Sequence, residues 1–329
     1  MFEQVCYAMI LRAVTPIAHH SESFGNTAVV MTEPVLQPDG SVIDVPIITG
    51  DTMRHGLRAA AAYALLAAAG LLDEPSLSEA ATRLLFAGGQ IGGSAGSTVS
   101  LSEYRQMVDL VPSLGLLGGC AGNRMYQGRL EVDRALLICR EAWTLLECDA
   151  WASSWISRTG YVVGSVQSHV GEATRVRMDP TLDPTKRALM SAQANTSTEQ
   201  RMLASETASE SGDAVAIREN KSTMMPRSFE VVASGSHYTW SLSAKLTSDL
   251  DRDTLHMMLS AWLTRMVVGG KKGTGHGKMQ VVPGSASCLH LTAKPEAFTF
   301  PSGGVGELFR SHVHARRDRI KDFLAKVEA

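Results

Sequence analysis

The sequence has little net charge of either sign. Its 31 Lys and Arg residues stand against 33 Asp and Glu residues, which gives a formal net charge of -2 at pH 7. A protein that binds nucleic acid over most of its surface is usually strongly basic. This composition therefore excludes a general basic shell, and any nucleic-acid site has to be a local cluster of cations.

The sequence also lacks paired cysteines. Its five cysteines are scattered and odd in number. Because there is no Cys-x-x-Cys pair and no Cys/His ladder, we expect neither a zinc site nor a disulfide framework, and no cofactor. This usage is typical of reduced cysteines in a cytoplasmic protein.

No hydrophobic run is long enough for a membrane. The longest apolar helix candidate, Ala59–Leu72, is too short and too rich in alanine to span a bilayer. The first six residues have no basic region, and Arg12 interrupts the apolar stretch that follows, so we expect no signal peptide. The sequence predicts a soluble cytoplasmic protein with no membrane partner.

Residues for catalysis are sparse as well. The close histidine pairs are His19–His20 and His312–His314, and neither comes with carboxylates at metal-ligand spacing. The chain has no Gly-x-Ser-x-Gly nucleophile motif. We therefore predict no metal site and no catalytic residues, and a small-molecule enzyme is disfavoured.

What the sequence does contain is an alternation of strand and helix patterns. Apolar periodicity and turn residues predict these elements: strands at 4–13, 27–36, 42–48, 129–139 and 279–282, a hairpin of 229–232 with 237–242, and helices at 50–70, 76–86, 255–268 and 305–327. Asp51 or Thr52 is the expected cap of the first helix, and Ser76 that of the second. The order is a βαββαβ skeleton. It predicts an α+β fold with a ferredoxin-like or RRM-like antiparallel sheet core.

We expect one RRM-like domain over residues 1–329 with three additions. These are a helical and loop insertion at 70–128, a thumb-like insertion at 178–224, and a C-terminal helix at 303–329. The thumb-like insertion is predicted because 178–220 is rich in Ser, Thr, Glu, Ala and Gln and has no aromatic residue.

The segment Gly269–Lys278, called here the glycine–lysine loop, has five glycines in ten residues. Glycine lets the backbone approach a ligand closely, and Lys271, Lys272, Lys278 and His276 add positive charge, so the loop suits phosphates. It departs from a nucleotide-binding P-loop, because Met279 stands where Ser or Thr would bind magnesium. The alternative is a flexible, solvated connection.

A second candidate anion site is the start of the first helix. Free N–H groups at a helix N-terminus attract anions. Arg54 and Arg58 are four residues apart and project on one side, with His55 beside them. The alternative is a pair of arginines on a solvated helix face.

These features occur together in one family. Ile48–Arg58 resembles the Ile-Pro-Gly-Ser-Ser-Leu-Lys-Gly-x-Leu-Arg motif of the RAMP superfamily of CRISPR-associated proteins, and Gly269–Lys278 resembles its C-terminal glycine-rich loop. Leu116–Gly118 followed by Gly128–Val132 resembles its middle motif, and Phe229–Leu242 resembles its Gly-Thr-x-Phe strand pair. The matches follow the family's order over about residues 1–290.

Within the superfamily the chain is most similar to the effector backbone subunits, the family numbered seven among Cas proteins, and especially to type IV members. The resemblance implies a non-catalytic subunit that binds guide RNA (crRNA) and polymerises along it in a CRISPR interference complex, where a thumb-like arm separates bases. Its implied partners are the crRNA guide, further copies of itself, other effector subunits, and a DNA or RNA target.

By this resemblance the RNA-binding residues lie in the loop after the first strand, the helix start, the thumb and its roots, and the glycine–lysine loop. They are Asn26, Thr52, Arg54, His55, Arg58, Arg175, Arg177, Met224, Met225, Arg227, Lys271, Lys272, Gly273, Thr274, His276 and Lys278. Methionines at the thumb root would act as apolar wedges between bases.

Two enzymatic alternatives remain within the superfamily. One is a guide-processing endoribonuclease, for which His19, His20 and His55 would serve. The other is type III-like cleavage of target RNA. Asn26 stands where type III relatives have a cutting aspartate, and an amide cannot act as a carboxylate base. Thr49, Asp51 and His55 also replace the motif's proline, serine and glycine, and we assign Asp51 to capping.

Overall fold

The computed structural model describes residues 3–24, 27–73, 77–89, 101–121, 124–177, 200, 225–290, 296–297 and 305–327. The chain divides into two compact units. The first contains Met1–Ser21, Val30–Gly171 and Val231–Ala329, and the second contains Glu22–Val29 and Glu172–Glu230. The predicted thumb-like insertion at 178–224 lies outside the described residues, except for residue 200.

The first unit is built on a large sheet. Its strands are β1 (Glu3–Ala13), β4 (Thr32–Leu36), β5 (Val42–Ile48), β8 (Leu130–Val132), β9 (Ala135–Leu137), β12 (His237–Leu246), β13 (Met279–Val281), β14 (Ser287–His290) and β15 (Glu296–Ala297). They follow the order β15-β14-β1-β12-β9-β5-β4, with β13 paired to β1 and β8 paired to β12. A separate two-stranded ribbon joins β6 (Gly119–Ala121) to β7 (Arg124–Tyr126).

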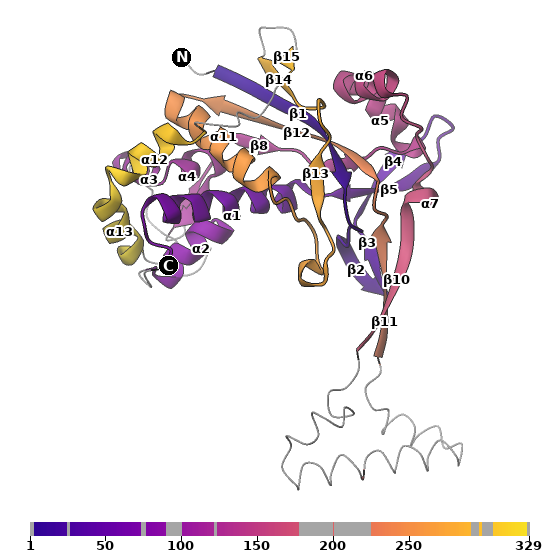
Figure 1. The fold of residues 1–329 in the computed structure, drawn as a ribbon, viewed down its shortest axis with the longest axis horizontal. Coiled ribbons are helices and arrows are strands. Elements are labelled where there is room, and N and C mark those ends of the chain that lie inside the picture. Colours follow the sequence, from indigo (N-terminus) through magenta and orange to yellow (C-terminus); the bar gives the residue numbers. More distant parts are fainter. Residues whose placement is uncertain are drawn as a thin grey trace. The chain divides into compact units, whose positions relative to one another are not determined.

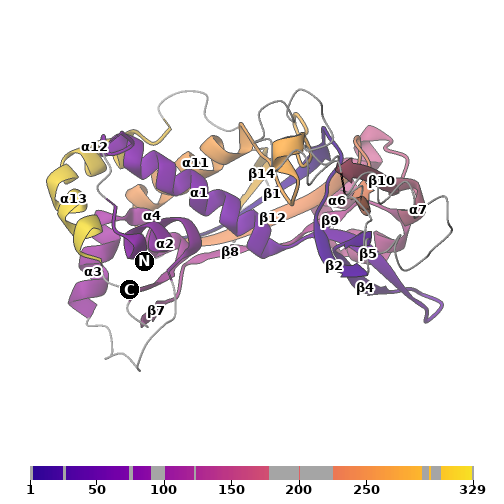
Figure 2. The ribbon, with the colours of Figure 1, turned by 90° about the horizontal axis from the view of Figure 1, so that it is seen from below.

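Helices cover both faces of this sheet. They are α1 (Gly50–Ala68), α2 (Glu79–Ala87), α3 (Leu101–Leu110), α4 (Pro112–Leu117), α5 (Trp143–Cys148), α6 (Ala150–Thr159), α7 (Val166–His169), α11 (Asp249–Leu263), α12 (Glu307–His314) and α13 (Arg317–Lys326), with 3-10 turns at Arg140–Ala142 and Lys272–Thr274. Helices α1 and α11 pack against each other over one face (Figures 1 and 2). On that face Tyr7 of β1 binds His256 of α11, with 2.7 Å between Oη and Nε2.

The opposite face of β1 and β12 is covered in part by α6. Thr239 of β12 donates to Asp149, the cap of α6, at 2.8 Å, and Trp151 donates to the carbonyl of Ser285 at 2.8 Å. Strand residues alternate between the two faces. Tyr7, Met9 and Leu11 point toward the helix pair and are fully buried there.

The predicted core is confirmed. Along the chain the elements run β1, α1, β8 with β9, β12, α11, then β13 with β14, and the central order is β14-β1-β12-β9 with antiparallel pairing. That is the 4-1-3-2 order of a ferredoxin-like sheet. Between α1 and β8 lie α2, α3, α4 and the β6–β7 ribbon, in the part of the chain where the sequence predicts a helical insertion.

The second unit contains most of a four-stranded sheet. Its strands are β2 (His20–Phe24), β3 (Thr27–Val30), β10 (Val170–Arg177) and β11 (Met225–Val232), in the order β10-β11-β3-β2. Strands β11 and β3 are parallel, with Ser228 opposite Thr27.

The predicted hairpin of 229–232 with 237–242 is wrong. Strand β11 pairs with β10 and β3, whereas β12 pairs with β1, β8 and β9. The turn between them is closed by the N–H of Ser236, which donates to the carbonyl of Ala233 at 3.3 Å, but it also bonds to the end of β1: Gly235 donates its N–H to the carbonyl of Ala13 at 2.7 Å, and Ala13 donates to that of Ser236 at 2.9 Å. These bonds to β1 send the two strands into different sheets.

Several predicted boundaries shift for local reasons. Ser78, rather than Ser76, caps α2, since its Oγ accepts from the N–H of Ala81 at 3.0 Å. Helix α11 begins at Asp249 after the cap Ser248 and ends at Leu263. The predicted strand at 129–139 is split at Asp133, whose N–H donates to the carbonyl of Ser241 at 3.1 Å.

The expected helix at 305–327 is two helices, α12 and α13, which end and begin around Arg316. Arg316 binds Asp109 of α3 through Nε, at 3.1 and 3.0 Å from its two carboxylate oxygens. Among the described helices, none combines the length and the apolar character needed to cross a membrane.

Candidate nucleic-acid interface

The glycine–lysine loop joins α11 to β13 and is closed by backbone hydrogen bonds (Figure 1). Val268 donates its N–H to the carbonyl of Gly277 at 2.9 Å, and Val267 forms an antiparallel bridge with Lys278. The tip is a 3-10 turn over Lys272–Thr274. The loop is thus an ordered extension of the sheet edge, with its tip held on a short closed stem.

Two glycines of the loop are required by neighbouring backbone. A Cβ at Gly277 would lie 2.0 Å from the carbonyl oxygen of Val268, and one at Gly269 would lie 2.7 Å from that of Ala18. Both residues have positive φ, 86° and 71°, which disfavours side chains. Gly273 differs, because a Cβ there would meet nothing within 4 Å. Internal packing therefore does not explain glycine at position 273.

Lys271 has an unusual backbone conformation. Its φ is 55°, the only positive value of a non-glycine residue in the described part of the chain. Its carbonyl accepts from the N–H of Thr274 at 3.0 Å and from the Thr274 hydroxyl at 2.9 Å. A residue in the left-handed backbone region followed by a right-handed turn makes successive backbone N–H groups point toward one spot. Such a concavity binds anions.

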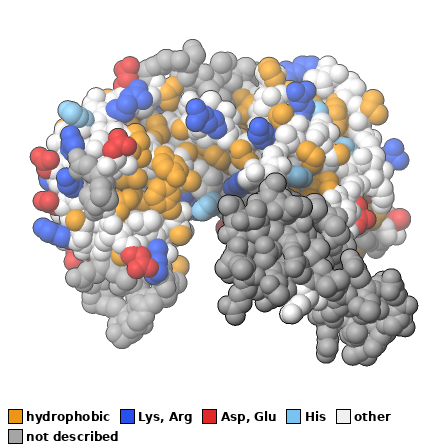
Figure 3. Space-filling model, turned by 60° about the horizontal axis from the view of Figure 1, so that its bottom comes forward, with side chains coloured by type: hydrophobic (Ala, Val, Ile, Leu, Met, Phe, Trp, Pro, Cys, Tyr) orange, Lys and Arg blue, Asp and Glu red, His pale blue; other side chains and the backbone are white. Residues whose placement is uncertain are grey.

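The cations of the loop are accessible. Lys272 and Lys278 are exposed, and within the described ranges their ammonium groups make no ion pair or hydrogen bond. Lys271 and His276 are half-buried, and Thr274 is exposed. On the face drawn in Figure 3, blue side chains stand separately among orange and white ones, so this face has no continuous basic surface.

Residues Pro16–His19 connect the loop to the start of α1. The N–H of Gly270 donates to Ala18 at 2.6 Å, and the N–H of Gly277 donates to Pro16 at 2.9 Å. The ring of His19 then accepts from the N–H of Thr49 at 3.3 Å. Burial, and then the neighbouring His20, lower the pKa of His19, so the neutral acceptor form is favoured.

Thr49 is the cap of α1. Its hydroxyl accepts from the N–H of Thr52 at 3.3 Å and lies 3.0 Å from the Thr52 hydroxyl. The prediction that Asp51 or Thr52 caps this helix is therefore wrong by two or three residues. Asp51 is exposed in the first turn, and His55 is exposed on the next.

Arg54 and Arg58 both turn inward. Arg58 is only 8% exposed. Its guanidinium donates to the carbonyls of Gly118 at 3.0 Å and Leu117 at 3.1 Å. Arg54 also binds the Leu117 carbonyl, and it donates to Leu130 at 2.8 Å. Cations stabilise the carbonyl end of a helix, and Leu117 is the last residue of α4.

This burial carries an electrostatic cost. Desolvation, and then the neighbouring Arg54, lower the pKa of Arg58 to about 10. Burial also lowers the pKa of Arg54, with a smaller opposing effect of Asp51. Both guanidiniums stay charged at neutral pH and bind backbone oxygens. Phosphate binding by either one stays a prediction.

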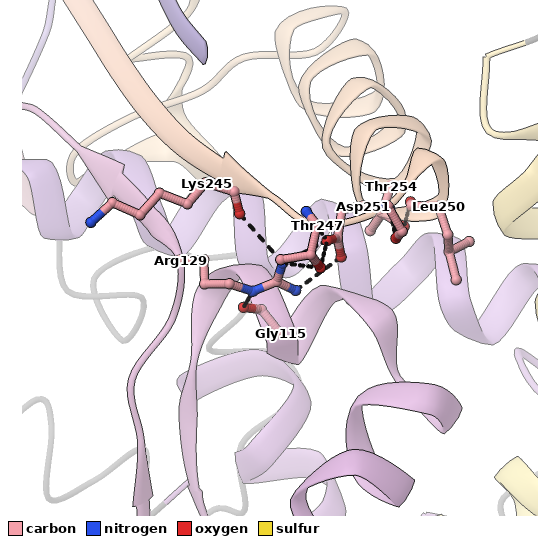
Figure 4. Close-up of polar contacts among 8 residues, drawn as sticks. Gly115, Arg129, Lys245, Thr247, Leu250, Asp251 and Thr254 are labelled. Carbon is pink, nitrogen blue, oxygen red and sulfur yellow. Dashed lines mark hydrogen bonds and ion pairs between the residues drawn. The ribbon is translucent and has the colours of Figure 1, made fainter. Parts of the chain in front are cut away.

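A third arginine joins the middle of the chain to α11 (Figure 4). Arg129 forms a two-pronged ion pair with Asp251, at 2.5 and 2.9 Å, and donates to the carbonyl of Gly115 at 3.1 Å. Burial alone would raise the pKa of Asp251, but hydrogen bonds from Arg129 and Thr247 outweigh it and lower that pKa. Arg129 thus anchors the insertion to α11, a role that its place in the sequence did not reveal.

The remaining predicted site residues lie in or beside the second unit. Asn26 and Met224 lie outside the described residues. For Arg175 and Arg177 on β10, and Met225 and Arg227 on β11, the structure describes the backbone only. The described residues contain no group of three or more His, Cys, Asp or Glu side chains able to hold a metal ion.

Comparison with known proteins bears on the fold. The sequence matches no family model and no curated protein. A chain of a solved structure described as a type IV-B CRISPR complex is similar in fold, with a TM-score of 0.51 and 16% sequence identity over 91% of this chain and 96% of that chain. The sequence resemblance to type IV backbone subunits and this likeness agree on one fold.

Proposed function

We propose that this chain is a non-catalytic backbone subunit of a type IV CRISPR interference complex, which binds crRNA and oligomerises along it in the cytoplasm. Its partners would be the guide, further copies of the chain, other effector subunits and the nucleic acid that the guide selects. The predicted contacts at Thr52, Arg54, His55 and Arg58 and at the thumb roots belong to the proposal.

One observation carries it: the glycine–lysine loop, closed by backbone hydrogen bonds, bears exposed cations. Lys272 and Lys278 have no described partner, and the frame of the loop is held by its own backbone hydrogen bonds. A polyanion gains most from cations that no internal carboxylate neutralises. The exposed lysines of the loop are therefore better placed to bind a sugar-phosphate backbone than Arg54 and Arg58 of α1, whose guanidiniums are turned inward.

The oligomeric part of the proposal is supported by the outer face of α1. From Ala59 to Leu72 the sequence has no charged residue. Within α1, Tyr63 is 59% exposed and packs edge-on against Phe86 of α2 with ring centroids 5.1 Å apart. Leu72, in the turn after α1, is 54% exposed. Exposed apolar surface of this kind marks interaction sites.

The experiment is co-expression with and without a CRISPR array. We expect the purified protein to carry RNA of guide length and to run as assemblies on a native gel. A monodisperse monomer with the absorbance ratio of bare protein, in the presence of the array, would contradict both parts of the proposal.

The non-catalytic part is tested separately. We expect no cuts in complementary target RNA with magnesium, and none in repeat RNA without metal. Regularly spaced target cuts that disappear in Asn26→Ala would assign the chain to the type III-like endoribonuclease alternative. Cuts in repeat RNA that require His19, His20 or His55 would assign it to guide processing.

A further inference from the structure

The end of β1 carries an exposed arginine on the face opposite the α1–α11 pair. Arg12 lies between Leu11 and Ala13, which are both buried, and its own side chain is exposed. In the sheet, Arg12 is opposite Gln280 of β13 and opposite His237 of β12. Directly opposite residues share a face. Arg12 therefore stands at the centre of a three-strand row.

Lys278 is the nearest cation of the glycine–lysine loop to this row. Its carbonyl accepts from the N–H groups of Val14 at 2.8 Å and Thr15 at 3.3 Å, which continues the β1–β13 pairing by one step. Lys278 is two residues from Gln280, so its side chain lies on the same face as Arg12 and diagonal to it. Such diagonal neighbours are about 7–8 Å apart.

The charge of Arg12 is not neutralised within the described part of the chain, where its guanidinium has no ion pair or hydrogen bond. The titratable group facing it is His237, which packs against Trp155 and Tyr161 with ring centroids 5.5 and 4.7 Å apart. Burial first, and then Arg12, lower the pKa of His237, so that ring is mainly neutral at pH 7. Arg12 and Lys278 thus form a local excess of positive charge.

The far end of the same sheet face carries negative charge. Glu131 and Asp133 lie there and accept hydrogen bonds from Ser243 and Ser241 of β12. Lys245, the next exposed cation along β12, is at the same end as Glu131. The β1 and β12 residues of this face include no Phe, Tyr or Trp, although RRM sheets stack bases on such rings. A polyanion would thus be held at the loop end and kept off the sheet face.

We propose that Arg12 is a phosphate contact of bound RNA, which extends the track of the glycine–lysine loop from Lys272 through Lys278 onto the end of β1. This rests on the proposed RNA-binding function and adds a residue outside the family motifs. The RNA would follow the β1–β13 edge rather than cross the sheet.

The test is the salt dependence of binding, measured by fluorescence anisotropy with a single-stranded RNA at several salt concentrations. We expect Arg12→Ala to reduce the slope of log affinity against log salt by about 0.7, the value for one lost phosphate contact on a single strand. Arg12→Lys should restore most of the slope. Arg105→Ala is the matched control, because Arg105 is an exposed cation on α3, and it should leave the slope unchanged.

The outcomes separate the two proposals. If Lys272→Ala reduces the slope and Arg12→Ala does not, the extended track is wrong and the loop site stands. If the wild-type protein shows no salt-dependent RNA binding, the proposed function fails together with the track. Because Arg12 is exposed, its variants should keep the wild-type melting temperature, which thermal unfolding checks.

Discussion

Arg58 donates a hydrogen bond of 3.0 Å to the carbonyl of Gly118, a residue 60 positions further along the chain. The other side of the same guanidinium faces Gly88, where an added Cβ would lie 3.1 Å from it. The first and middle motifs of the family resemblance therefore contact each other, and Arg58 forms a structural link between α1 and the end of α4.

Arg58→Ala should lower the free energy of unfolding by about 2 to 3 kcal/mol, because two charge-assisted hydrogen bonds are lost and the carbonyls of Leu117 and Gly118 lose a donor. Arg58→Lys should lose less, since a single ammonium group retains the charge but cannot reach both oxygens in the same geometry. Urea unfolding measures both. Unchanged stability with a smaller salt slope of RNA binding would instead make Arg58 a phosphate contact.

Lys271→Ala/Lys272→Ala should weaken binding similarly for every RNA sequence and reduce the salt slope by about 1.4, or 0.7 per contact. Met224→Ala/Met225→Ala should weaken binding with little change in slope, because stacking contacts release no counterions. The comparison uses the same anisotropy titration for both variants. An unchanged slope in the lysine variant would mean that the loop faces solvent.

The glycines of the loop provide a matched pair. Gly277→Ala should destabilise the protein by at least about 2 kcal/mol, because the new Cβ collides with the Val268 carbonyl at a positive φ. Gly273→Ala should change stability by no more than about 0.5 kcal/mol. If RNA approaches the loop tip closely, Gly273→Ala should nevertheless weaken binding. Normal affinity in this variant would exclude close approach at that residue.

Tyr63→Glu should reduce assembly on RNA while the isolated subunit keeps its fold. The side chain is mostly exposed, so the substitution costs little in the monomer, but a charge in an apolar contact is strongly unfavourable. Analytical ultracentrifugation with a long RNA measures the effect. Glu79→Gln on the neighbouring α2, where the Glu79 side chain is 78% exposed, is the control. Equal assembly by wild type and Tyr63→Glu would exclude this face of α1 as a contact between copies.

The sequence predicted the βαββαβ core because each of its elements has its own local signal. Strand β1 is an apolar run closed by Thr15–Pro16, and α11 has acidic residues in its first turn and an apolar stripe. The glycine–lysine loop was predicted for the same reason, since its composition is unusual by itself.

Features set by distant contacts were not predictable. The buried apolar residues of α12 and α13 follow a single helical period: they are Phe309, Val313, Ile320 and Leu324. This periodicity predicts one helix, although the chain breaks into two helices where Arg316 binds Asp109. The turn at Ala233–Ser236 has the composition of a hairpin, but its bonds to Ala13 are made across more than two hundred residues of sequence. The sequence assigns no binding role to Arg12, because a single cation in an apolar run has no pattern.

The chain enters the second unit twice, at Glu22 and at Glu172, and returns to the first unit each time, at Val30 and Val231. The first excursion begins after β1 and ends before β4, and the second begins after α7 and ends before β12. The register of the main sheet therefore does not depend on how many residues lie between β10 and β11. An insertion or deletion between β10 and β11 would therefore leave every strand pair of the main sheet in register.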